Sequence, residues 1–275
     1  MESVEVKQLK QKNCRFCNSQ LRHIFVSLGF SPLSNGYLSK EQLQEREVFY
    51  PLEVYVCEDC FLVQLQEFEA PADIFCDYAY FSSYSDTWLR HAQDYVEKIA
   101  PLLNINKNSF VVEVASNDGY LLQYFAAKGI PVLGIEPARN VAEIARQKNI
   151  PTEISFFGVE LANRLVSESK SADLILGNNV LAHVPDINDF VAGLKIILKP
   201  NGVITMEFPH LMNLVDKVQF DTIYHEHFSY FSFLTVKKIF ESHDLTIFDV
   251  QELTTHGGSL RIYARHVDNQ VRKIS

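Results

Sequence analysis

Short apolar runs alternate with stretches of helical spacing along the chain from Ser109 onward. The apolar runs predict strands over 110–115, 131–135, 150–154, 172–176 and 203–208. Apolar residues that recur three and four positions apart predict helices over 118–128, 138–148, 159–168, 187–198 and 233–243. Strands separated by helices build a parallel sheet with helices on both faces, so the pattern predicts a doubly wound α/β fold.

The C-terminal part of the chain departs from this order. Residues 245–250 and 260–264 are separated by a turn-rich stretch that contains Gly257-Gly258. This arrangement predicts two antiparallel strands at one edge of the sheet.

The part before Ser109 has a different pattern. Residues 21–28 and 48–56 alternate apolar and polar positions, which predicts two short strands, and Asn35-Gly36 predicts a turn between them. Residues 86–103 have helical spacing. The tyrosine-rich segment 77–85 is too aromatic for a linker and too irregular for a core strand.

Four cysteines form two C-x-x-C pairs, Cys14 with Cys17 and Cys57 with Cys60. This spacing lets each pair hold one metal ion from a single turn, and two pairs complete a tetrahedral zinc site with four sulfur ligands. The alternative is two separate redox pairs. A four-sulfur site has no open position for catalysis, so the expected zinc is structural and locates a small domain.

Composition and charge narrow the class of protein. With 47% hydrophobic and 21% charged residues, the 275-residue chain resembles a globular protein, and its length suggests one large domain or a medium one with a small appendage. We expect a zinc-binding domain over 1–75 and a second domain over 76–275. A net charge of −9 and the lack of a Lys/Arg cluster argue against a nucleic-acid partner.

The thiols and the N-terminus predict a cytoplasmic protein. Met1 to Asn13 is polar and has no apolar signal-peptide region, and no apolar run approaches the roughly 20 residues that cross a bilayer. Paired thiols without a secretion signal fit a reducing compartment, where they bind metal. Cys76 has no partner, and we expect it to be buried packing.

Small and polar residues follow three predicted strands, where a doubly wound sheet binds its ligands. The first strand runs into Ala115–Gly119, which contains one glycine and therefore does not match the G-x-G-x-x-G of NAD-binding proteins. Glu136 ends the second strand and can accept hydrogen bonds from both ribose hydroxyls. Residues 177–184, which include Asn178 and His183, follow the fourth strand. The residues at these three strand ends together predict a nucleoside-binding site.

This combination resembles the class I S-adenosylmethionine-dependent methyltransferases. The matching features are the acidic Glu113 in the first strand, the small loop after it, Glu136, and Leu198–Gly202 before the fifth strand. The resemblance implies a Rossmann-like methyltransferase fold and S-adenosylmethionine as cofactor. It implies cofactor contacts from Tyr84, Ser85, Glu113, Ser116, Asn117, Asp118, Gly119, Glu136, Pro137 and Asn178.

Residues 224–231 hold two imidazoles, a carboxylate and two phenols, which are the groups that proton transfer needs. The stretch is not H-E-x-x-H, because Ser229 occupies the place of the second histidine, so a zinc protease is unsupported. The alternative is that residues 224–231 have no catalytic role and are the polar start of a surface helix.

The ordered motifs resemble a narrower family, the C-methyltransferases that act on nucleotide-linked keto-deoxysugars. The motifs are the cysteine pairs, Tyr78–Ser83, Asn178 to His183, Tyr224–His227 and His256–Arg261. The family's zinc ligands correspond to Cys14, Cys17, Cys57 and Cys60. Its active-site residues correspond to Tyr78, His183, Tyr224, Glu226 and His227. The family also carries a further C-terminal domain that helps to hold the sugar nucleotide, whereas the sequence considered ends at Ser275.

Carbon becomes nucleophilic only when a proton is removed next to a carbonyl, so C-methylation needs a base and a group that stabilises the enolate oxygen. We assign the base to Glu226 with His227, and enolate or hydroxyl contacts to Tyr224, His183 or Tyr78. The alternatives are an O- or N-methyltransferase, which needs less acid–base machinery, and a zinc-stabilised module that binds a nucleoside without turnover. The expected role of the zinc is to fix a small domain whose following segment, Tyr78–Ser85, covers the cofactor crevice.

Overall fold

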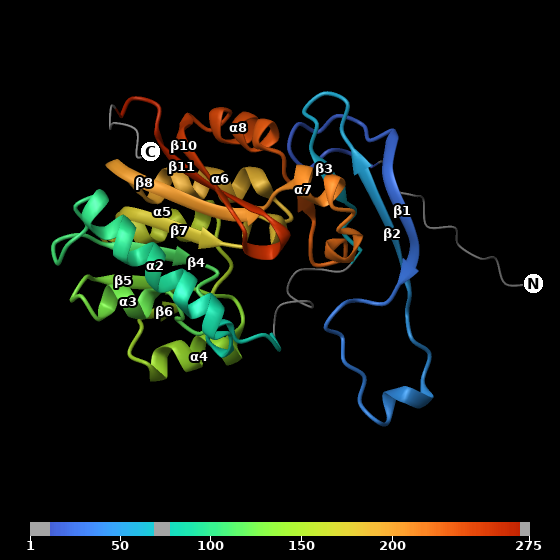
Figure 1. Ribbon diagram of the computed structural model, residues 1–275, viewed down its shortest axis with the longest axis horizontal. Helices are drawn as coiled ribbons and strands as arrows, with labels where there is room; N and C mark the ends of the chain where they lie inside the picture. The colour runs from blue at the N-terminus through green and yellow to red at the C-terminus, as the bar shows by residue number, and fades with distance from the viewer. Residues whose placement is uncertain (1–11, 69–77, 270–275) are drawn as a thin grey trace, which may run out of the picture.

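The structure is a computed structural model that describes residues 12–68 and 78–269. A seven-stranded sheet and a four-stranded sheet make up the two ends of the molecule, and Figure 1 shows them side by side. No helix in the described residues combines the length and the apolar character that a membrane span requires.

The seven-stranded sheet has the order β10-β11-β8-β7-β4-β5-β6. The pairs from β8 to β6 are parallel, and β11 is antiparallel to both β8 and β10. This is the doubly wound sheet with an antiparallel edge that the sequence pattern predicts. The strands are β4 (Val111–Val114), β5 (Val132–Ile135), β6 (Thr152–Glu153), β7 (Ala172–Asn178), β8 (Leu198–Pro209), β10 (Leu245–Leu253) and β11 (Ser259–His266).

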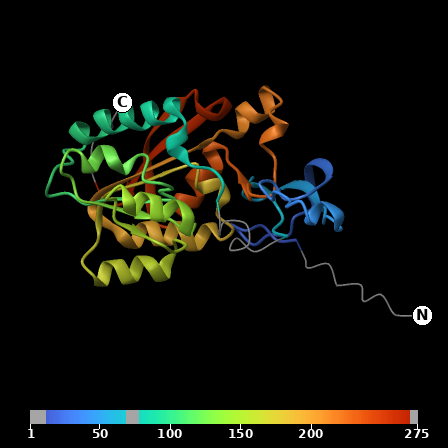
Figure 2. The same ribbon diagram turned by 90° about the horizontal axis from the view of Figure 1, so that it is seen from below.

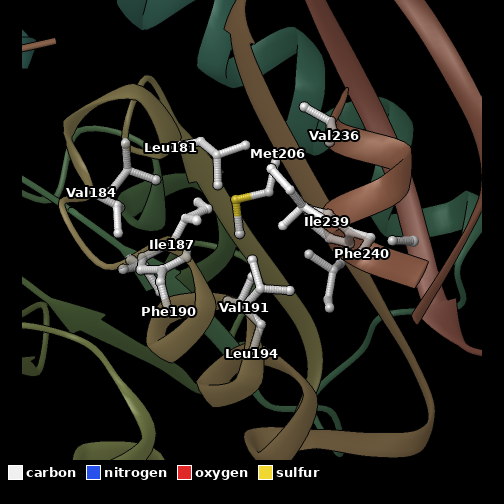
Figure 3. Close-up of a cluster of buried hydrophobic side chains, with 14 of the residues drawn as sticks. Leu181, Val184, Ile187, Phe190, Val191, Leu194, Met206, Val236, Ile239 and Phe240 are labelled. Atoms are coloured by element: carbon white, nitrogen blue, oxygen red, sulfur yellow. The ribbon is translucent and has the colours of Figure 1, made fainter. Parts of the chain in front are cut away.

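Helices cover both faces of this sheet. Apolar side chains of α2 and α3 belong to one buried cluster, together with Ala145 of α4, and those of α5, α6 and α8 belong to another on the opposite face. In Figure 3, Met206 of β8 lies between the buried side chains of α6 and α8. The helices are α2 (Asp86–Leu102), α3 (Leu122–Ala126), α4 (Arg139–Gln147), α5 (Val159–Ser167), α6 (Ile187–Ile197), α7 (Leu211–Asp216) and α8 (Phe233–Glu241).

Two predicted boundaries are wrong, each for a local reason. The helix predicted over 118–128 is α3, which begins only at Leu122, because Ala115, Asn117 and Gly119 have positive φ and form an irregular turn. The strand predicted from residue 203 is β8, which begins at Leu198 because that residue already pairs with Ala172 of β7.

The four-stranded sheet has the order β1-β2-β3-β9 and contains segments from both ends of the chain. The two strands predicted in the N-terminal part correspond to β1 (His23–Ser31) and β2 (Tyr50–Val56). β3 (Val63–Leu65) pairs with β9 (Ser229–Tyr230), which follows the seven-stranded sheet's β8 along the chain. Figure 2 shows this sheet beside one end of the larger sheet. Cys76 and the expected domain boundary at residues 75 and 76 lie outside the described residues, and the boundary stays a prediction.

A buried ion pair joins β8 to β11. The Glu207 carboxylate is fully buried and accepts hydrogen bonds from the Arg261 guanidinium, from Thr255 Oγ1 at 2.7 Å and from His91 Nε2 at 2.9 Å. Burial raises the pKa of Glu207, but His91 and Arg261 more than offset this effect, so the pKa lies below its usual value. The partners therefore stabilise the charged carboxylate in the interior.

We expect Arg261→Leu to lower the free energy of unfolding by about 3–5 kcal/mol, because it leaves the Glu207 charge buried without its main partner. The matched control is Lys237→Leu, which removes an exposed ion pair with Glu241 and should change stability by less than about 0.5 kcal/mol. Urea denaturation of both variants measures the difference. Equal losses in the two variants would contradict this account of the pair.

Candidate functional site

A cavity of about 700 Å³ lies where the parallel strands end. Its wall includes Val114 and Ala115 after β4, Glu136 after β5, and Asn178 at the end of β7. The carboxyl ends of strands are the usual ligand site of a doubly wound sheet, as the sequence predicts. Side chains from the N-terminal region and from residues 219–227 close the opposite side.

A sharp turn after β4 brings the backbone to Glu136. Ala115 (φ 58°) and Asn117 (φ 49°) take the left-handed conformation, which is uncommon outside glycine. The amide of Asn117 donates to Glu136 Oε2, and the amide of Ala138 donates to Oε1, both at 2.9 Å. Burial raises the pKa of Glu136 to about 7, although these two amides act in the opposite direction. A carboxylate held at this place has the position expected for a ribose-binding residue.

The tyrosine-rich segment is hydrogen-bonded across the same strand end. The Asn117 side chain accepts from the backbone amide of Ser82 at 2.9 Å and donates to the carbonyl of Tyr80 at 3.0 Å. The Asn140 side chain bonds both backbone groups of Tyr78. Tyr78, Tyr80 and Ser82 line the cavity, so this segment forms part of its wall.

The predicted cofactor contacts divide into two groups. Those on the cavity wall are Asn117, Glu136, Pro137 and Asn178. The others lie off the wall. Tyr84 is 82% exposed, and the Ser85 side chain caps the N-terminus of α2. Glu113 and Ser116 are buried, and Gly119 has a positive φ in the turn after β4. Asp118 forms hydrogen bonds with Lys148 and Ser83. The role of each as a cofactor contact stays a prediction.

Several wall residues are absent from the sequence-based set. The Trp88 ring stacks on Tyr120 with ring centroids 5.9 Å apart and meets His256 edge-on at 5.0 Å. Trp88 fits the helical spacing of α2, so the pattern indicated only a core position. Asn35 was identified only as a turn residue. Phe156 is 49% exposed and lies beyond the short strand β6, where the apolar pattern gives no functional signal.

The predicted acid–base residues all line the same cavity. They are Tyr78, His183, Tyr224, Glu226 and His227.

Hydrogen bonds set the tautomers of the two histidines. His227 Nδ1 donates to the carbonyl of Thr222 at 2.8 Å, so its Nε2 carries the lone pair and accepts from the Tyr224 hydroxyl at 2.9 Å. His183 Nδ1 donates to the carbonyl of Glu226 at 2.9 Å. The centroids of the His183 and His227 rings are 4.7 Å apart.

Burial keeps these imidazoles neutral near pH 7. It lowers the pKa of His227 to about 4, and burial together with the adjacent His227 lowers the pKa of His183 to about 3. Burial and the nearby Glu226 raise the pKa values of Tyr78 and Tyr224, so both phenols keep their protons. The cavity therefore offers neutral imidazoles and protonated phenols beside the Glu226 carboxylate.

The four paired cysteines converge on one point. Their Sγ atoms lie within 4.8 Å of one another, and both Cys14–Cys60 and Cys17–Cys57 have Sγ atoms 3.5 Å apart. A tetrahedral zinc–thiolate site with bonds of about 2.3 Å has sulfur–sulfur edges of about 3.8 Å, so the thiols fit zinc. Gln64 Nε2 lies 3.1 Å from Cys14 Sγ and supplies a donor to that sulfur. Convergence of both pairs favours one metal site over two redox pairs.

The first cysteine turn is bonded to the loop that carries His183. The Arg15 guanidinium donates to the carbonyl of Pro185 at 2.8 Å and to the carbonyl of Leu65. The Asn188 side chain donates to the carbonyl of Phe16 at 2.9 Å. Among the described residues, these contacts link the metal site to the acid–base wall. The expected role of the zinc, to fix a small domain whose following segment 78–85 covers the cofactor crevice, stays a prediction.

We expect metal removal by a chelator to loosen the acid–base wall before the cofactor wall, because Arg15 joins the cysteine turn to Pro185. Hydrogen exchange should accelerate in 181–188 and 224–231 while 111–117 stays protected. Arg15→Met should reproduce the change with the metal retained. Faster exchange confined to 78–85 would contradict this linkage.

We also expect Glu136→Gln to weaken S-adenosylmethionine binding by about tenfold to a hundredfold, because an amide replaces a carboxylate that accepts charge-assisted hydrogen bonds. Calorimetry with S-adenosylmethionine and S-adenosylhomocysteine measures the effect. Glu143→Gln, at an exposed position on α4, is the control and should bind normally. Equal affinity in both variants would remove Glu136 from the ribose site.

Both the N-terminal cysteine region and the larger domain of this chain are similar to known protein families. The family model described as "Methyltransferase domain" matches residues 86–250, and that described as "Putative zinc binding domain" matches residues 14–75. The C-methyltransferase NovU of Streptomyces niveus is 34% identical over 94% of this chain. The aligned part spans 62% of the length of NovU.

Solved structures share the larger fold. An S-adenosylmethionine-dependent methyltransferase from Clostridium acetobutylicum superposes with a TM-score of 0.52 and 12% identity, over 65% of this chain and 92% of that one. The PH0226 protein of Pyrococcus horikoshii superposes with a TM-score of 0.51 and 15% identity, over 69% of this chain and 97% of that one. The predicted fold class is thereby confirmed. The chain belongs to the S-adenosylmethionine-dependent methyltransferase family and carries an N-terminal zinc-binding domain.

Proposed function

We propose that this enzyme C-methylates a nucleotide-linked keto-deoxysugar through an enolate that its own side chains generate. The observation that carries the proposal is the set of acid–base residues that line the same cavity as Glu136 and Asn117. A reacting carbon in the cavity would lie between a base and the nucleoside end. The similarity to NovU, a protein named as a C-methyltransferase, supports transfer to carbon.

Glu226 is the base in this proposal. Its side chain accepts hydrogen bonds at Oε1 from Ser34 at 3.1 Å and from Asn35 at 2.7 Å, so we assign Oε2 to take the proton next to the carbonyl. Burial raises the pKa of Glu226 and makes the carboxylate a stronger base than it is in water.

The Tyr224–His227 pair supports the enolate. The Tyr224 hydroxyl donates to Nε2 of the neutral His227 ring, which orients the phenol before the reaction. When the enolate forms, the hydroxyl turns this single proton from His227 Nε2 to the developing oxyanion. Tyr78 and His183 line the same cavity, and we assign them contacts with the enolate oxygen or the sugar hydroxyls. S-adenosylmethionine supplies an electrophilic methyl group when it is bound, and the cavity aligns the two reactants.

The charges of the cavity fit the sugar ring better than its diphosphate. Among the described residues on its wall, none is lysine or arginine, and the carboxylates of Glu136, Asp221 and Glu226 face it. We therefore assign the keto-sugar ring to this cavity and the diphosphate to a place outside it. A cytoplasmic location, where the cysteine thiols stay reduced, belongs to the same proposal.

We expect Glu226→Gln to slow exchange of the substrate's carbon-bound proton with solvent deuterium by at least about a hundredfold, because general-base catalysis contributes roughly 10²–10⁴-fold. His227→Asn should slow methyl transfer by a comparable factor. Exchange in the wild type should rise with pH as Glu226 loses its proton, since its pKa lies above the usual value. The measurement is deuterium incorporation by mass spectrometry, followed by methyl transfer to a panel of nucleotide-linked keto-sugars.

The controls are Glu241→Gln and His23→Asn, at exposed positions outside the cavity. Normal exchange in Glu226→Gln would exclude it as the base. Products methylated at oxygen or nitrogen would replace the proposal with the O- or N-methyltransferase alternative. Cofactor binding without transfer to any acceptor in the panel would favour the non-catalytic alternative.

A further inference from the structure

We propose that Asn35 is a positioning residue for this reaction, and that its side-chain amide orients the Glu226 carboxylate at the substrate end of the cavity. The inference rests on the proposed function only in giving Glu226 the role of base. Asn35 belongs to the loop between β1 and β2, so the zinc-binding part of the chain supplies a residue to the reacting centre.

The contact is direct and comes from a constrained turn. Asn35 Nδ2 lies 2.7 Å from Glu226 Oε1, and the adjacent Ser34 Oγ lies 3.1 Å from the same atom. Asn35 has a φ of 57°, a left-handed conformation that asparagine tolerates better than most residues. Both Asn35 and Glu226 line the cavity. The turn therefore presents two consecutive donors to one oxygen.

The stem of the same loop is bonded to the neighbour of Glu226. His225 Nε2 donates to the carbonyl of Pro51 at 3.2 Å, and the His225 ring packs edge-on against Tyr50 and Phe68 at centroid distances of 5.9 and 6.0 Å. Across the loop, Ser31 pairs with Tyr50. The loop thus contacts the Tyr224–His227 stretch beside both of its ends, through Ser34 and Asn35 shortly after β1 and through Pro51 at the start of β2.

The surroundings explain why a neutral amide matters at this place. The Glu226 charge helps to raise the pKa values of Tyr78 and Tyr224, and His183 Nδ1 donates to the backbone carbonyl of Glu226. No lysine or arginine is among the described wall residues that could offset the carboxylate charge. Burial raises the pKa of Glu226, and Asn35 and then Ser34 oppose that rise. Removal of Asn35 should therefore favour the protonated, inactive form of the carboxyl.

The test variant is Asn35→Gly, because glycine adopts a positive φ without strain and so removes the amide while keeping the turn. Asn104→Gly is the matched control, since Asn104 is also left-handed (φ 55°) but lies in an exposed position at the end of α2. Carbon-13 NMR follows the titration of the Glu226 carboxyl in the full chain without substrate, and Glu226→Gln identifies the signal. We expect Asn35→Gly to raise the midpoint by about one pH unit, the size of one lost hydrogen bond to a charged group.

Kinetics supply the second measurement. In Asn35→Gly, kcat for methyl transfer should fall near pH 7 and recover as the pH rises, whereas Asn104→Gly should match the wild type at every pH. Ser34→Ala should show a smaller shift in the same direction. An unchanged Glu226 midpoint in Asn35→Gly would overturn the inference. A raised midpoint with an unchanged pH profile of methyl transfer would support the Asn35 contact and overturn the role of Glu226 as base.

Discussion

The backbone of residues 228–231 is hydrogen-bonded to the four-stranded sheet and to the turn that follows β7 of the larger sheet, and the site depends on this connection. Phe228 donates to the carbonyl of Ala182 beside His183, and its own carbonyl accepts from Leu65 of the four-stranded sheet. Ser229 and Tyr230 then extend that sheet as β9. These backbone hydrogen bonds hold the segment on two sides at once. Tyr224, Glu226 and His227 precede this segment immediately, so both sheets determine where their side chains lie.

The two walls of the cavity use different means to hold buried carboxylates. Glu136 receives two backbone amides from the turn after β4, an arrangement that comes from the doubly wound fold itself. Glu226 receives side-chain donors from Ser34 and Asn35, which reach it from the zinc-binding region. Burial raises the pKa of both groups. The cofactor end is therefore organised within one sheet, and the reacting end is organised between two.

Prediction from the sequence succeeded where the signal is local. The apolar runs that became β4 to β8 are buried on both faces, and the spacing of α2, α4 and α6 follows one buried stripe, so both have a clear period. Cys14 to Cys60 could be grouped because metal ligands have a fixed spacing. Prediction was weaker at the turn after β4, where three positive φ angles shorten α3. A left-handed backbone conformation does not change the order of apolar and polar residues, so the hydrophobic pattern does not predict it.

The sequence by itself determined the order of strands and helices, the metal-binding cysteines and the chemical types of the acid–base residues, because these follow from periodicity, ligand spacing and side-chain chemistry. Only the tertiary structure decided that β9 joins the N-terminal sheet and that Asn35 contacts Glu226. It also decided that Arg15 connects the cysteine turn to the His183 loop. These contacts join residues that are far apart in the chain, so they form only where the packing of the two sheets brings those residues together.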